Sequence, residues 1–199
     1  MVLKWPNRML KKCATHFFLL SMCCASGYSF GEAPRDCDHL IANFINQPDE
    51  STRAMLDQGA GDCWAKIQDS NEKIDALATL VRNGKRSAVA YLAPHLRQLD
   101  GGNLEDALIA LGVFAESNME EFLDLESRGE LTSREASDSL TMLPLPLSDD
   151  LRAQLVTMRR RRAAVIGVSR TDLAKVKTHA LSTIDKFIVE IKSVDTSSP

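Results

Sequence analysis

The feature that most constrains the fold is the spacing of apolar residues after Arg35, which follows a helical period. In the first such segment, Cys37, Leu40, Ile41 and Phe44 recur at intervals of three and four residues. This spacing places them on one face of a helix. No later segment shows the strict alternation that is typical of a half-buried strand. The sequence therefore predicts an all-α protein.

Capping and breaking signals divide this region into about eight helices. Ser117 with Glu120, and Thr132 with Glu135, each have the spacing of a capping box. The run Gly59-Ala60-Gly61 is expected to end one helix before a turn that carries Cys63.

A single domain accounts for these helices. The chain of 199 residues has room for one substantial core. Short turns between consecutive helices favour antiparallel hairpins. We therefore expect one all-helical domain over residues 36–194, an irregular stack of antiparallel helical hairpins or a bundle. Residues 195–199 are expected to form a frayed tail.

One short sequence pattern occurs twice in the chain, and we call this pair the internal echo. Leu80 and Gly84 recur 45 residues later as Leu125 and Gly129, and a helix that meets a proline, Pro94 or Pro144, follows each pair. This spacing resembles a HEAT-like helical repeat over residues 70–166. The resemblance implies an architecture and no activity.

The first thirty residues have the pattern of a secretory signal peptide. A basic leader without acidic residues contains Lys4, Arg8, Lys11 and Lys12. An apolar stretch at 13–25 and small residues at 25–27 or 29–31 follow it, so cleavage is expected at about 27–33. An uncleaved membrane anchor or a buried first helix is the alternative. The signal peptide predicts a periplasmic or secreted protein.

Cysteine usage agrees with export. Cys13, Cys23 and Cys24 lie in the signal segment, which leaves Cys37 and Cys63. In an oxidising compartment this pair predicts a disulfide, and two unpaired buried thiols are the alternative. The two cysteines are distant in sequence and lack the ligand spacing of a zinc site, so neither a metal site nor a cofactor is predicted.

The charge of the region after the signal segment is acidic. Residues 1–27 contain four of the 24 basic residues and none of the 27 acidic ones, so 20 basic residues face 27 acidic residues after cleavage. A net charge of −7 disfavours nucleic acid and favours a basic protein partner. No apolar run reaches the roughly 18 residues that span a bilayer, so no integral membrane domain is expected.

Catalytic motifs are absent from the sequence. His39, His95 and His179 are scattered, although one of them could meet a serine and a carboxylate in the folded chain. Three acidic pairs also occur near helix starts, where the helix dipole favours acidic residues. These pairs are Asp36 with Asp38, Glu120 with Glu121, and Asp149 with Asp150.

The run Arg159-Arg160-Arg161-Arg162 is the most unusual local feature. Four consecutive residues of a helix point in four directions. We expect Arg162 beside the apolar stripe, either with its stem along the core or paired with an acidic residue. Arg159, Arg160 and Arg161 are then a solvated face and a candidate anion-binding group.

Two classes of function remain. The absence of catalytic spacing favours an exported, noncatalytic helical protein-binding module. Periplasmic inhibitors and immunity-type proteins are examples of small, acidic, exported proteins in this class, and they are named by analogy alone. The alternative is a cell-envelope hydrolase whose site is built from dispersed carboxylates or histidines.

Overall fold

The computed structural model describes residues 36–195, without the side chains of 60–62 and 195, and this part is all-helical. No strand occurs in it, and none of its helices is long and apolar enough to cross a membrane. The predicted signal peptide lies outside the described residues. The helices are α1 (Cys37–Asn46), α2 (Glu50–Gln68), α3 (Asn71–Arg82), α4 (Arg86–Leu92), η1 (Ala93–Gln98), α5 (Gly101–Ser117), α6 (Met119–Ser127), α7 (Ser133–Thr141), η2 (Leu145–Leu147), α8 (Leu151–Gly167), η3 (Thr171–Leu173) and α9 (Ala174–Asp195), where η marks a 3₁₀ helix.

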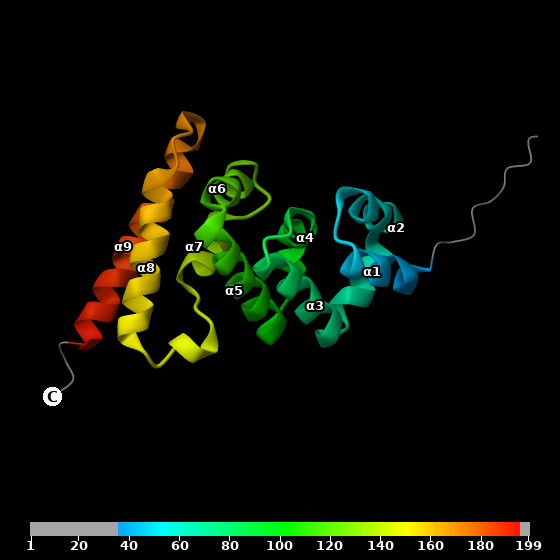
Figure 1. The fold of residues 1–199 in the computed structure, drawn as a ribbon, viewed down its shortest axis with the longest axis horizontal. Helices are drawn as coiled ribbons and strands as arrows, with labels where there is room; N and C mark the ends of the chain where they lie inside the picture. Colours follow the sequence, from blue (N-terminus) through cyan, green and yellow to red (C-terminus); the bar gives the residue numbers. More distant parts are fainter. Residues whose placement is uncertain (1–35, 196–199) are drawn as a thin grey trace, which may run out of the picture. The chain divides into compact units, whose positions relative to one another are not determined.

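Alternate helices lie side by side (Figure 1). In one row α1 contacts α3, α3 contacts α5, α5 contacts α7, and α7 contacts α9. In the other row α2 contacts α4, and α6 contacts α8. Consecutive helices such as α1 and α2, or α8 and α9, also pack against each other. The helices therefore form two layers of successive hairpins.

The internal echo corresponds to two matching helix ends. Gly84 after α3 and Gly129 after α6 both have a φ of 76°, which glycine adopts at no steric cost. After each glycine, the next backbone N–H bonds back to the echoed leucine carbonyl, Leu80 or Leu125, at 3.0 Å. A helix and then a proline-containing 3₁₀ helix, η1 or η2, follow each turn before a 17-residue helix, α5 or α8.

The predicted break at residues 59–61 is wrong, because α2 runs through it without interruption. Gly59 faces the cysteine pair, and a Cβ atom there would lie 2.5 Å from Cys63 Sγ. This glycine therefore leaves room for the disulfide sulfur of Cys63, one turn further along α2, and does not end the helix.

The two predicted capping boxes have different outcomes. Thr132 and Glu135 form theirs, since each side chain accepts a hydrogen bond from the other residue's backbone N–H. The box at Ser117 is wrong, because Ser117 is the last residue of α5 and Asn118 precedes α6 without a side-chain cap.

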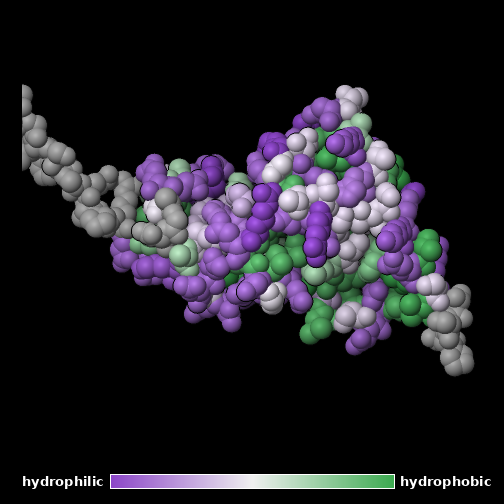
Figure 2. Space-filling view, turned by 180° about the vertical axis from the view of Figure 1, so that it is seen from behind, coloured by the Kyte–Doolittle hydropathy of each residue, from purple (hydrophilic) through white to green (hydrophobic). Residues whose placement is uncertain are grey.

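The core runs through all the described helices except η2, and its largest apolar side chains include Phe44, Phe114 and Phe122. The surface seen in Figure 2 is mainly hydrophilic, with hydrophobic residues gathered near the C-terminal end of the described chain. Five of the six exposed large hydrophobic side chains in the described part lie between residues 145 and 194.

Candidate functional site

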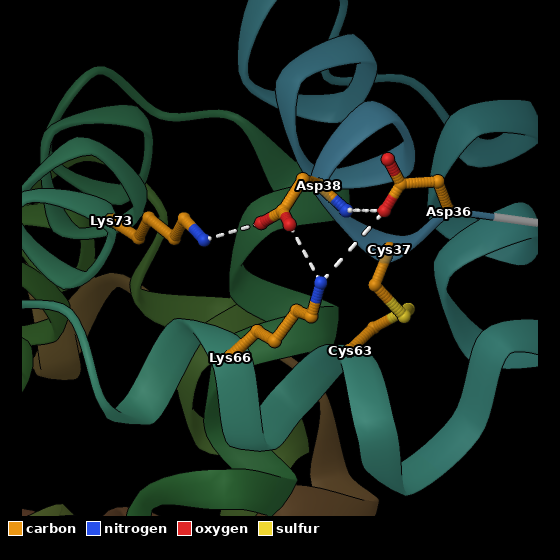
Figure 3. The surroundings of a disulfide bond; sticks show 6 residues. All are labelled: Asp36, Cys37, Asp38, Cys63, Lys66 and Lys73. Carbon is orange, nitrogen blue, oxygen red and sulfur yellow. Dashed lines mark hydrogen bonds and ion pairs between the residues drawn. A yellow bond between two sulfur atoms is a disulfide. The ribbon is translucent and has the colours of Figure 1, made fainter.

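The predicted cysteine pair is present in the structure. Cys37 opens α1 and Cys63 lies in α2, and a disulfide joins them with a Cα–Cα distance of 5.0 Å (Figure 3). Beside it, Asp38 accepts hydrogen bonds from Lys66 Nζ at 2.6 Å and Lys73 Nζ at 2.8 Å. These two ammonium groups lower the pKa of Asp38 to about 2. The cluster ties α1, α2 and α3 together, which is a structural role.

An aromatic cluster packs next to the disulfide. Trp64 stacks on His95 with ring centroids 4.3 Å apart, and Tyr91 contacts both rings. Burial raises the pKa of Tyr91 to about 12, so its hydroxyl stays protonated. His95 Nδ1 lies 2.7 Å from the Tyr91 carbonyl oxygen. His95 is therefore held as a packing residue.

The arginine run has a different register from the predicted one. Arg161, not Arg162, enters the core, and its side chain is fully buried. Its guanidinium donates hydrogen bonds to the carbonyl oxygens of Ser139, Leu140 and Met142 at the end of α7, at 2.8–3.2 Å. It also donates to Glu116 Oε1. These bonds occupy its donors, so Arg161 is not available to an anion at the surface.

The other three arginines lie outside the core. Arg160 pairs with Glu116 at 3.2 Å, and Arg162 pairs with Asp185 at 2.6 Å. Arg159 is exposed. Anion binding by Arg159 and Arg160 stays a prediction, without Arg161 as a third member.

The acidic pairs mostly serve helix starts. Asp36 accepts a hydrogen bond from the Asp38 N–H as the N-cap of α1, and Asp150 accepts one from the Ala153 N–H at the start of α8. Among the residues that the structure describes, no group of three or more histidine, cysteine, aspartate or glutamate side chains could hold a metal ion.

One histidine meets a serine and a carboxylate. His179 of α9 has its Nδ1 3.0 Å from Glu126 Oε1 and its Nε2 3.2 Å from Ser137 Oγ. Thr183 Oγ1 lies 3.2 Å from the same serine oxygen. Glu126 belongs to α6 and Ser137 to α7, so three helices bring these groups together. The arrangement is that of a serine–histidine–carboxylate triad.

A pocket of about 390 Å³ adjoins this triad. His179 and Glu126 line it, together with Ser127, Ser133, Asp172, Lys175 and Val176. The Glu126 side chain is only 4% exposed, and its Oε2 has no hydrogen-bond partner in the described part of the protein. The His179 side chain is 36% exposed, so the imidazole lies between the buried acid and water.

A second candidate surface runs along the turns that join the paired helices. We name it the turn edge; its charged residues are Asp49, Glu50, Lys85, Arg86, Glu120, Glu121, Asp124 and Arg170. Direct bonds align the turns: Ser87 Oγ donates to the Pro48 carbonyl at 2.7 Å, and Arg86 pairs with Glu121 at 2.9 Å. Two cavities of about 390 and 400 Å³ share Arg86 on this edge.

Comparison of the chain with protein-family models, curated proteins and solved structures gave no significant match. The sequence did not single out Ser137 or Glu126, which lie 42 and 53 residues from His179. The available signal was limited to His179 itself and to Ser133 and Ser137, which share a helical face at a spacing of four.

Proposed function

We propose that this chain is an exported protein-binding module that engages a basic partner through the turn edge. The observation that carries the proposal is the two-layer order of hairpins, because it brings turns distant in sequence onto one surface. Stacked helical repeats commonly bind other proteins through such extended surfaces. The matching helix ends at Gly84 and Gly129 support a HEAT-like architecture for the stack.

The charge of the turn edge favours a basic partner. Five carboxylates and three cations line its two cavities, so the edge is net acidic. The region after the predicted cleavage site has a net charge of −7, since its 20 basic residues face 27 acidic ones. Charge complementarity of this kind accelerates association and orients the partner. The partner should therefore present lysine and arginine side chains to the edge.

A matched pair of charge reversals tests the proposal. The edge variant is Glu50→Lys with Glu120→Lys, both exposed residues of the turn edge. The control is Glu105→Lys with Asp106→Lys, which makes the same change of net charge on α5. Glu105 lies about 18 Å along the helix axis from the end of α5 that meets the edge.

The full chain is expressed in exported form, and wild type and both variants are used in parallel to capture partners. We expect the edge variant to slow association with the captured partner by about tenfold at low salt, and the control to have little effect. The rate for wild type should also fall as salt rises, because the screening length shortens to about 8 Å at physiological ionic strength. A partner that binds all three proteins equally, or no partner at all, contradicts the proposal.

A further inference from the structure

We propose that Ser137, His179 and Glu126 form a serine-dependent site that hydrolyses esters of small acyl groups. This inference goes beyond the proposed binding function and does not depend on it. It stands on the order of the hydrogen bonds in the triad, the burial of its acid and the adjoining pocket.

The hydrogen bonds assign one role to each atom of the triad. The Glu126 carboxylate only accepts, so the proton of the neutral imidazole is on Nδ1 and points to Glu126 Oε1 at 3.0 Å. Nε2 is then free to accept the Ser137 hydroxyl proton across 3.2 Å. Thr183 can donate its own proton to Ser137 Oγ, which leaves the Ser137 proton directed to the histidine. This order is the one that activates a serine nucleophile.

The burial of Glu126 suits the acid of such a triad. Its side chain is 4% exposed and its Oε2 has no partner among the described residues, so water solvates this carboxylate poorly. An imidazolium that forms beside it is therefore stabilised more strongly than it would be in water. His179 gains a positive charge when it takes the serine proton, and Glu126 is placed to stabilise that charge.

The pocket supplies room for the acyl group and donors for its oxygen. Its volume of about 390 Å³ is at the small end for ligand sites. Backbone N–H groups around Ser137 bond within α7, so a developing oxyanion needs side-chain donors. Lys175 and Ser133 line the pocket and make no side-chain hydrogen bond or ion pair with the residues that the structure describes. They line the pocket together with His179, and we assign this role to them.

The reaction balances with water as the only co-reactant. Ser137 Oγ attacks the acyl carbon, and its proton moves to His179 Nε2. The bond between the acyl carbon and the alcohol oxygen breaks, and the alcohol leaves with that proton. Water then loses a proton to His179, attacks the acyl-serine and releases the carboxylic acid, which restores the Ser137 hydroxyl.

A fluorophosphonate probe tests the nucleophile directly. The probe phosphorus bonds to an activated serine and fluoride leaves, so intact mass and peptide mapping report the site. Full-chain protein is compared with His179→Gln and with His39→Gln, an exposed histidine of α1. Ser137→Ala and the exposed Ser182→Ala form the second pair. Hydrolysis of p-nitrophenyl acetate is measured on the same samples, and circular dichroism checks the fold.

We expect a single adduct on Ser137, absent from Ser137→Ala and unchanged in His39→Gln and Ser182→Ala. Labelling and ester hydrolysis should fall by about 100-fold or more in His179→Gln, the scale of a lost general base. No adduct on Ser137, or labelling of Ser137 that His179→Gln leaves unchanged, overturns the proposal. Either result leaves the turn-edge binding test unaffected, because that test uses other residues.

Discussion

Replacing Arg161 with methionine should destabilise the fold far more than the same change at Arg159. Methionine retains an apolar stem but removes the guanidinium that donates to three carbonyl oxygens at the end of α7 and to Glu116. Loss of one partner of a buried charge pair costs about 3–5 kcal/mol. Arg160 still pairs with Glu116, whose side chain is 17% exposed, so we expect about 3 kcal/mol, near the lower bound.

Thermal and urea unfolding of the two variants measure this difference. For a domain of this size about 3 kcal/mol corresponds to a fall in Tm of about 6–12 °C. Arg159→Met changes an exposed side chain and should stay within about 0.5 kcal/mol of wild type. If the two variants unfold within about 1 kcal/mol of each other, the burial of Arg161 and its role at the end of α7 are refuted.

Three further predictions concern close packing, the disulfide and pH. Gly112→Ala should lower the free energy of unfolding in urea by about 1–3 kcal/mol, because the added Cβ would overlap the Ser139 carbonyl oxygen. The control Gly102→Ala adds a Cβ that faces open space and should not destabilise the fold. Equal losses of stability in the two variants would refute the close approach at Gly112. Cys63→Ser should lower the free energy of unfolding by about 2–5 kcal/mol, and a reductant should lower the Tm of the wild-type protein. If neither change reduced stability, the disulfide would be contradicted. Asp38 has a lowered pKa of about 2, so its contribution to stability is present above an unfolded pKa of about 3.8 and is lost as the pH falls through about 2. The difference in Tm between wild type and Asp38→Asn at pH 7 should therefore vanish near pH 2, and its persistence there would exclude a charge effect.

Local signals predicted the class of fold and several element boundaries. The capping box at Thr132 was correct because its two partners lie three residues apart and need no tertiary contact. The interval at residues 59–61 was misread because a glycine near the end of a periodic segment is also the residue that fits a close approach. Cys63 lies four residues beyond Gly59, so the two share a helix face only if the helix continues, and the disulfide to Cys37 is what needs the space.

The candidate triad could not be predicted because its members come from three helices. Sequence spacing reports neighbours on one helix, whereas His179 and its two partners are 42 and 53 residues apart. The packing of α7 against α9 sets the distance from Ser137 to the histidine, and the end of α6 sets the position of Glu126. The helix order alone does not contain these distances.

The arginine run shows why apolar periodicity was an incomplete guide for α8. Its buried face includes Gln154, Thr157 and Arg161 beside the apolar Met158 and Val165, while Ile166 is 51% exposed, so the apolar residues mark the side that faces inward only in part. The last turn of α7 and the chain between α7 and α8 explain why polar residues share the buried face. The carbonyl oxygens at a helix end have no partner within the helix and need donors where they approach the core, since an unpaired buried carbonyl is costly.

Gln154 donates to the carbonyls of Leu147 and Ser148, and Arg161 donates to those of Leu140 and Met142. Gln154 and Arg161 of α8 are therefore buried where they bond carbonyl oxygens at the end of α7 and in the segment that follows it. A one-residue error of register rotates a helix by about 100°, which is the difference between the predicted Arg162 and the observed Arg161. The carbonyl oxygens that fix the register of α8 belong to the preceding part of the chain. Their positions relative to α8 are set only in the folded protein, so the sequence does not show them.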